Sequence, residues 1–154
     1  MAKQDLNEKV ILIAGGAKNL GGLISREFAA NGAKIVVHYN SAATKNDADV
    51  TVQAILNNGG EAIALQGDLT QAANVTALFE QAKQRFGGID IAVNTVGKVL
   101  RKPIIDTTEA EYDEMLAINS KVAYFFIKEA GIHLNDNGKI ITIVSSLLAA
   151  FTDG

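Results

Sequence analysis

Short apolar runs alternate with longer amphipathic stretches along this chain of 154 residues. The runs are rich in Val, Ile, Leu and Ala, a composition typical of parallel strands that are buried on both faces. We predict strands at residues 9–14, 34–39, 62–66, 89–94 and 139–145. We predict helices between them, at residues 20–30, 44–57, 72–86 and 109–134. This alternation indicates an α/β fold, a doubly wound parallel sheet of about five strands, in one domain spanning residues 1–154.

The ends of the predicted helices support this assignment. Thr108 and Glu111 have the spacing of a capping box, and glycine-containing pairs follow the helical stretches. Helical crossovers of this length connect parallel strands in a right-handed sense, so the carboxyl ends of the strands meet at one edge of the sheet. Doubly wound sheets bind their ligands at that edge, and we expect the functional residues there.

Composition narrows the range of partners. The formal net charge is -3 and the sequence pI is ≈ 5.3, so we expect no nucleic-acid partner. The chain has no cysteine, which excludes disulfides and thiolate zinc sites and is compatible with a cytoplasmic location. It begins with a polar segment and has no run of about 18 apolar residues, so we expect neither a signal peptide nor a membrane partner. His38 and His133 stand far apart without other ligands nearby, and we expect surface or strand-end residues, not a metal site.

A glycine-rich turn follows the first predicted strand and opens the first predicted helix, in residues 15–22. Gly16 and Gly21 have the spacing that begins a triphosphate-binding loop, but Gly22 and Leu23 stand where that motif requires Lys and then Ser or Thr. The fingerprint G-x-G-x-x-G is also absent. Glycines at this place let backbone approach a ligand closely, and the helix amides and dipole favour a diphosphate. The turn could also simply close a tight corner.

The turn resembles T-G-x-x-x-G-x-G, the signature of the short-chain dehydrogenase/reductase family. Ala14 stands in place of the threonine, and Asn19 stands in place of the middle glycine. Asn enters the left-handed region of backbone space readily, so the turn can persist. The resemblance implies a Rossmann fold, of which this chain comprises the first part, the C-terminal part of the family domain being missing. The implied cofactor-binding residues in the turn are Gly15, Lys18, Asn19, Leu20 and Gly21.

The segment after the second predicted strand favours NADP(H) as the cofactor. NAD enzymes place an Asp or Glu there, about 20 residues beyond the glycine turn, to bind the ribose diol. This chain has Tyr39, Asn40 and Ser41, which we expect to line the cofactor ribose. Lys18 lies where NADPH-preferring relatives commonly carry a base, and we expect it to contact the 2′-phosphate. The alternative is a solvated loop lysine.

Two further segments resemble family motifs at strand ends. Asp68 and Leu69 follow the third predicted strand, where the family acid contacts the adenine edge and the next residue supports it. A helix cap made by Asp68 or Thr70 is the alternative. Asn94 and Gly97 match the N-N-A-G motif at two positions, which implies backbone passing near the cofactor ribose. A simple strand-to-loop turn would explain the same two residues.

The resemblance implies two catalytic residues. Asn119 lies where a family asparagine tolerates a helix irregularity and holds a water in the proton relay. Taken alone, such an asparagine would be a solvent-facing polar residue. Ser146 fits the S-x-x-G pattern, with Ala149 in place of the glycine, and Ser145 is the alternative register. The implied role of Ser146 is a hydroxyl that hydrogen-bonds the substrate carbonyl.

The family proton donor is a tyrosine in Y-x-x-x-K, some dozen residues beyond that serine. Only residues 147–154 follow Ser146 here. Tyr124 and Lys128 have the right spacing, but they precede the serine in a helix, and we interpret them as packing or subunit-contact residues. We therefore expect the 154-residue chain alone to be inactive, as either a fragment of a longer reductase or a natural short form.

The whole pattern predicts an NADP(H)-dependent oxidoreductase that transfers a hydride between nicotinamide and a small-molecule carbonyl or alcohol. A resemblance to 3-oxoacyl-acyl-carrier-protein reductases is a fold-level analogy. The alternative is a non-catalytic NADPH-binding or sensor protein, and a weaker one is a flavodoxin-like signalling module. The long predicted helix is apolar on more than one side, which favours a homo-oligomer, a dimer or tetramer.

Overall fold

The computed structural model describes residues 6–144. Its core is a five-stranded sheet with the order β3-β2-β1-β4-β5, in which all neighbouring strands are parallel. The strands are β1 (Val10–Ala14), β2 (Lys34–Tyr39), β3 (Glu61–Gln66), β4 (Ile91–Asn94) and β5 (Lys139–Thr142). The predicted doubly wound sheet is confirmed.

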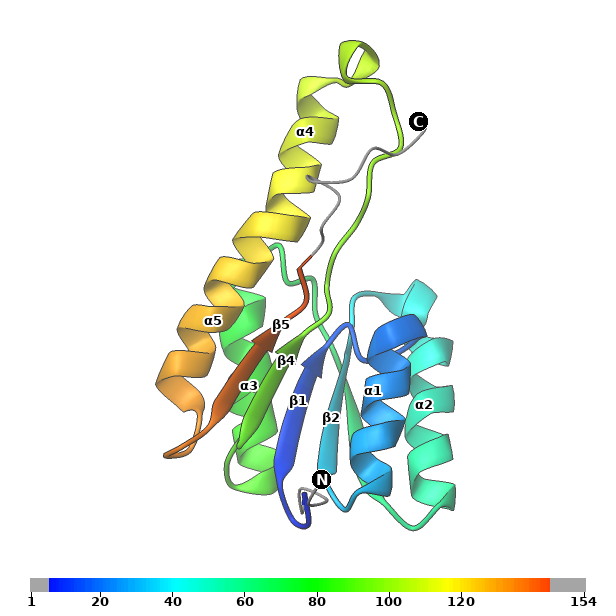
Figure 1. Cartoon of the computed structure of the whole chain (residues 1–154), viewed down its shortest axis with the longest axis vertical. Helices are drawn as coiled ribbons and strands as arrows, with labels where there is room; N and C mark the ends of the chain where they lie inside the picture. The colour runs from blue at the N-terminus through cyan, green and yellow to red at the C-terminus, as the bar shows by residue number, and fades with distance from the viewer. Residues whose placement is uncertain (1–5, 145–154) are drawn as a thin grey trace.

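Helices cover both faces of the sheet (Figure 1). The helices are α1 (Asn19–Ala30), α2 (Lys45–Asn57), α3 (Ala72–Phe86), α4 (Glu109–Leu116) and α5 (Val122–His133). Short 3-10 turns, η1 (Ala42–Thr44) and η2 (Ile104–Asp106), precede α2 and α4. Helices α1 and α2 pack together on one face, and α3 and α5 pack together on the other.

The side chains of β1 alternate between two apolar cores. Ile11 and Ile13 belong to the core beneath α1 and α2, whereas Leu12 belongs to the core beneath α3 and α5. This is the period of two that a strand requires. Phe79 of α3 and Phe126 of α5 are fully buried in the second core, with ring centroids 5.1 Å apart. A strand that is buried on both faces explains the continuous apolar run.

The long helix predicted at residues 109–134 is interrupted. A π-helical segment, η3 (Ala117–Lys121), separates α4 from α5. The strand predicted at residues 89–94 begins at Ile91, and the Asp90 carboxylate just before it accepts a hydrogen bond from the Val10 amide. The strand predicted at residues 139–145 ends at Thr142. The other elements agree with the predicted bounds to within one residue.

The strand order reverses beside β1, and this places the site. The chain adds β2 and β3 on one side of β1 and then crosses over to add β4 and β5 on the other. The carboxyl ends of β1 and β4 therefore flank a topological switch point, where open α/β sheets bind ligands. Helix α4 projects beyond this end of the sheet (Figure 1). Within residues 6–144, no helix reaches the length and apolarity that crossing a membrane requires.

Candidate dinucleotide-binding cleft

A cleft with a volume of about 630 Å³ opens at the carboxyl ends of the strands. Its walls come from the glycine turn, the ends of β2, β3 and β4, and the junction of α4 with η3. The lining residues are Gly15, Ala17, Lys18, Asn19, Leu20, Gly21, His38, Tyr39, Asn40, Thr44, Asp68, Leu69, Thr70, Thr95, Val96, Gly97, Glu114, Ala117, Ile118 and Val122. All the predicted cofactor-binding residues line it except Ser41 and Asn94.

The glycine turn requires its glycines. Gly15 has a φ of +75, and a Cβ there would lie 2.8 Å from Thr95 Oγ1. A Cβ on Gly21 would overlap the carbonyl oxygen of Gly15, so the first turn of α1 can approach the strand only without a side chain. Asn19 has a φ of 50, which confirms that Asn can stand in place of the family glycine.

Buried hydroxyls fix the turn from below. Ser25 Oγ donates to the carbonyl oxygens of Gly16 (3.0 Å) and Gly21 (2.9 Å). Thr51 Oγ1, from α2, donates to the carbonyl oxygen of Ala17 at 2.6 Å. These bonds engage the carbonyls of the turn, while its concave side and the amino end of α1 face the cleft. A helix amino end in this position suits a phosphate.

His38 was missed as a site residue by the sequence analysis. It lies near the end of β2, as the strand-end expectation has it, but it is only 2% exposed, so the expectation of a surface histidine was wrong. Its Nδ1 accepts a hydrogen bond from the Gly15 amide at 3.0 Å, and its Nε2 lies 2.7 Å from the Gly67 carbonyl oxygen. Burial lowers the pKa of His38, although the Gly67 carbonyl and the Asp68 charge oppose that shift. A polar residue within an apolar strand was the only available signal.

His133 has a different environment from the one expected. It ends α5, its Nε2 lies 3.3 Å from Glu129 Oε2, and its ring stacks on Phe79. These contacts place His133 at the base of the α3–α5 core, away from the cleft. Residues 6–144 contain no group of three or more His, Asp or Glu side chains arranged to hold a metal ion.

Lys18 stands at the mouth of the cleft, but it has a partner that the sequence analysis did not anticipate. Its Nζ lies 3.0 Å from Asp47 Oδ2 of α2, and both side chains are partly exposed. Tyr39, Asn40 and Thr44 line the cleft next to this pair. Ser41 is set back from the cleft, and its amide donates to Thr44 Oγ1 at 3.3 Å.

The loop after β3 is organised by Asp68. Its Oδ1 accepts from the amide (3.0 Å) and the hydroxyl (2.7 Å) of Thr70. The N-cap of α3 is Gln71 and has no side-chain capping bond, so the alternative that Asp68 or Thr70 caps this helix was wrong. Leu69 is 3% exposed and joins the core while it lines the cleft. The Asp68 carboxylate therefore closes a turn at the cleft edge.

The end of β4 is held by short local bonds. The buried Asn94 accepts through Oδ1 from the Val96 amide at 3.0 Å, as the strand-to-loop alternative expects. Thr95 Oγ1 donates to the carbonyl oxygen of Ala14 at 2.8 Å, which joins the ends of β4 and β1. Gly97 follows, and a Cβ there would lie 3.3 Å from Asn119 Oδ1. The loop after β4 approaches the π-helical segment closely at Gly97, which explains why this position has no side chain.

Asn119 lies in the π-helical segment and bridges two elements. Its Oδ1 accepts from the Lys98 amide at 2.9 Å, and its Nδ2 donates to the carbonyl oxygens of Lys98 and Met115, each at 3.0 Å. Asn119 is exposed, as the solvent-facing alternative expects, but its side chain also joins these two elements. Asn119 does not itself line the cleft, but Ala117 and Ile118 beside it do.

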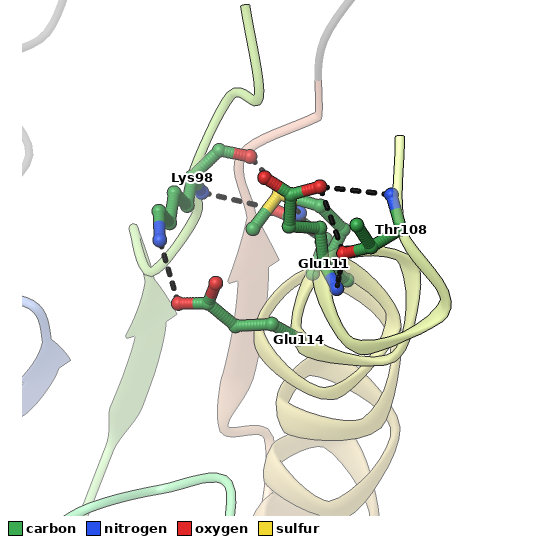
Figure 2. A network of polar contacts seen from close by, with 6 residues as sticks. Lys98, Thr108, Glu111 and Glu114 are labelled. Carbon is green, nitrogen blue, oxygen red and sulfur yellow. Dashed lines mark hydrogen bonds and ion pairs between the residues drawn. The ribbon is translucent and has the colours of Figure 1, made fainter. Parts of the chain in front are cut away.

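Two ion pairs hold the β4–α4 connection against α4, and Figure 2 shows the pair between Lys98 and Glu114. Lys98 Nζ lies 2.6 Å from Glu114 Oε1, and Lys102 Nζ lies 2.9 Å from Glu111 Oε2. Glu111 also completes the predicted capping box with Thr108. The Lys102 ammonium and the Thr108 amide and hydroxyl lower the pKa of Glu111 to about 2. Glu114, the partner of Lys98, also lines the cleft.

The remaining predicted residues fall elsewhere. Ser145 and Ser146 lie outside the described residues. Tyr124 is 69% exposed and lines a separate groove on the outer side of α4 and α5, with Leu116 and Phe125. Lys128 pairs with Glu129. Neither Tyr124 nor Lys128 lines the cleft.

The sequence matches reductases along nearly its whole length. Residues 15–152 match the family model described as enoyl-(acyl carrier protein) reductase. The chain is 36% identical over 146 residues to the hydroxynaphthalene reductase-like protein Arp2 of Metarhizium brunneum, covering 95% of this chain and 54% of that protein. It thus spans about half the length of the curated relatives it matches.

Two solved structures share the fold and hold a nicotinamide cofactor. A protein from Burkholderia cenocepacia with bound NADP superposes with a TM-score of 0.92 at 61% identity, over 99% of this chain and 58% of that one. A blue fluorescent protein from a metagenomic library, in complex with NADPH, superposes with a TM-score of 0.88 at 36% identity, over 95% of this chain and 59% of that one.

Proposed function

Because the chain belongs to the short-chain dehydrogenase/reductase family, we propose that its cleft binds NADP(H). We propose that the protein serves hydride transfer between the nicotinamide and a small-molecule carbonyl or alcohol. The observation that carries this proposal is the glycine turn: Gly15 and Gly21 leave space that a Cβ would fill, at the switch point of the sheet and at the amino end of α1. That is a cradle for a diphosphate.

The residues around the cleft supply a site for each part of the cofactor. The turn from Gly15 to Gly21 would hold the diphosphate, and Asp68 with Leu69 would border the adenine. Lys18 would face the 2′-phosphate beside Tyr39, Asn40 and Ser41. No acid follows β2 to bind a free ribose diol, which favours NADP(H) over NAD(H). Asn94 would brace the strand end, and Gly97 would let backbone pass the second ribose.

When bound, the nicotinamide supplies or accepts the hydride. The chain contributes groups that orient the reactants and stabilise charge. We propose that the Ser146 hydroxyl donates a hydrogen bond to the substrate oxygen, where negative charge develops. We propose that Asn119 holds the π-helical segment in its irregular conformation beside the cleft. We also propose that Asn119 takes part in a proton relay. A substrate like that of 3-oxoacyl-acyl-carrier-protein reductases is compatible with this chemistry.

One observation favours a second candidate, an NADPH-binding or sensor protein without turnover. Of the tyrosines in the described part of the chain, Tyr39 alone lines the cleft, and it lies at the end of β2 and not beside η3. A tyrosine there is poorly placed to protonate an alkoxide at the nicotinamide end. Binding without reduction of any carbonyl, in a form of the protein that extends beyond residue 154, would favour this candidate.

The binding proposal is tested by calorimetric titration of the chain with NADPH and NADH. We expect NADPH to bind more tightly than NADH, and Gly21→Ala to abolish binding of both, because its Cβ meets the Gly15 carbonyl. Gly131→Ala is the matched control: Gly131 lies in α5 with nothing within 4 Å of an added Cβ. Retained binding in Gly21→Ala would contradict the proposed cradle.

We also propose that the protein is a homo-oligomer, a dimer or tetramer. The outer side of α4 and α5 exposes large apolar side chains, including Tyr112, Leu116, Tyr124, Ile127 and Ile132. Exposed apolar groups gathered on one pair of helices are typical of protein interfaces. Sedimentation equilibrium should show a mass above that of one chain, and Tyr124→Glu should lower that mass. A monomer at all concentrations would contradict this proposal.

A further inference from the structure

We propose that His38 is a positioning residue for the dinucleotide cleft and makes nucleotide affinity depend on pH. In this proposal the neutral imidazole links the glycine turn to the loop after β3, and protonation breaks that link. The inference rests on the proposed NADP(H) site, because the effect on affinity acts through the Gly15 turn. His38 is not placed in contact with the reacting atoms.

The hydrogen bonds determine which form of His38 the structure requires. The Gly15 amide can only donate, so Nδ1 of His38, 3.0 Å away, must accept and cannot carry a proton. The Gly67 carbonyl can only accept, so Nε2, 2.7 Å away, must carry the proton. Together these contacts select the neutral Nε2–H tautomer. The ring thus spans the floor of the cleft between two loops that line it.

Protonation of Nδ1 would place two donors face to face. The Gly15 amide would lose its acceptor, and the turn has little freedom to find another. Gly15 already has a φ of +75, and Thr95 and the first turn of α1 pack against it. The His38 side chain is also enclosed, with a residue exposure of 2%. An imidazolium can therefore be accommodated only if the ring or the glycine turn moves, and either movement alters the diphosphate cradle.

The charges around His38 are few and come from several elements. Asp68, after β3, is the acid whose charge favours the imidazolium, and burial outweighs it to keep the ring neutral. The other ionisable side chains on the cleft wall are Lys18 on the turn, Tyr39 on β2 and Glu114 on α4. Lys18 and Glu114 are each paired with an opposite charge, Asp47 and Lys98. No described carboxylate makes a hydrogen bond to the His38 ring.

The neutral Nε2–H tautomer determines how the affinity for NADPH should change with pH. Affinity for NADPH should be constant at pH values where His38 is neutral. It should fall as the pH drops through the His38 pKa, by up to about tenfold per pH unit, because binding then requires release of a proton. An attraction between imidazolium and the cofactor phosphates would produce the opposite slope. The two possibilities are therefore separable by one titration series.

The test is calorimetric binding of NADPH to the chain between pH 8 and pH 5, in wild type and two variants that do not titrate. His38→Asn retains an acceptor at the position of Nδ1, and His38→Gln retains a donor at the position of Nε2. Cofactor phosphates titrate equally in all three proteins. We expect a steeper loss of affinity with acid in wild type than in either variant. At pH 8 we expect His38→Asn to bind more tightly than His38→Gln.

Parallel slopes in the three proteins would overturn the inference, as would wild-type affinity that rises with acid relative to the variants. Loss of NADPH binding by wild type at pH 8 would instead contradict the proposed function, and the inference with it. Nitrogen NMR of wild type gives a readout that needs no variant. We expect His38 to show the Nε2–H tautomer, and an Nδ1–H tautomer or an imidazolium at pH 7 would overturn the proposal. His133 is the only other histidine and serves as the reference signal.

Discussion

Individual side chains at the strand ends do more than line a cavity. His38 joins the glycine turn to the loop after β3, and Asp47 holds the Lys18 ammonium at the mouth of the cleft. The Lys18–Asp47 pair is partly exposed, so it contributes little to folding stability. It can therefore be exchanged for a contact with a ligand phosphate at small cost. The proposed preference for NADPH therefore depends on Lys18 and its surroundings.

Lys18→Ala tests this selectivity. We expect the variant to lose about ten- to a hundredfold in affinity for NADPH, because a hydrogen bond to a charged group contributes about 1.5–3 kcal/mol. Its affinity for NADH should change little. Titration calorimetry of both cofactors measures the two effects, with Lys83→Ala on the exposed side of α3 as the control. Equal losses for NADPH and NADH would show that Lys18 does not recognise the 2′-phosphate.

Among the elements, the π-helical segment and the β4–α4 connection are coupled through Asn119. Three hydrogen bonds from one side chain join Lys98 and Met115 across this junction. The segment also positions Ala117 and Ile118 on the cleft wall. A change at Asn119 should therefore affect both the local fold and the cleft.

For Asn119→Ala we expect a loss of about 1–2 kcal/mol in the free energy of unfolding, because the lost bonds are exposed and water replaces part of each. Urea denaturation measures that loss. Asn135→Ala is a suitable comparison, since its amide makes one exposed side-chain bond, to Asp90, away from the cleft. If Asn119→Ala were no more destabilising than Asn135→Ala, the bridging role would be contradicted.

The sequence predicts most elements because they follow regular periods. The strands are continuous apolar runs, and the helices carry amphipathic spacing, so their order and the sheet class follow from pattern alone. The break in the helix at residues 117–121 does not follow from periodicity, because the predicted helix is apolar on more than one side and gives no clear register against which an inserted residue would stand out. Only the resemblance of Asn119 to a family residue indicated it. The roles of His38 and Asp47 depend on contacts with residues distant in sequence, which no local pattern encodes.

At the scale of the whole molecule, residues 6–144 contain the cleft that we propose for the cofactor, and none of their tyrosines lies where the proposed proton donor is needed. Tyr124 lies on an exposed groove, and the cleft holds Tyr39 at the other end. The chain spans about half the length of its curated relatives. Cofactor binding and carbonyl reduction can therefore be measured separately.

We expect no measurable carbonyl reductase activity from the 154-residue chain. Absence of a general acid lowers rates by about 10²–10⁴-fold. Oxidation of NADPH, followed by absorbance with a panel of carbonyl compounds, measures the activity. A chain extended beyond residue 154 to include a Y-x-x-x-K motif is the positive comparison. Turnover by the short chain that is lost in Tyr124→Phe would mean that Tyr124 is the proton donor.

The most direct test of the central claim is the location of bound NADPH on this chain. Backbone amide NMR spectra, recorded as NADPH is added, report which amides change their surroundings. We predict the largest shifts at Gly15, Asn19 and Gly21, with further shifts at Asp68 and Gly97, and smaller shifts near Lys18 when NADH replaces NADPH. Shifts confined to the outer groove around Tyr124, or no shifts at a saturating concentration, would contradict the account.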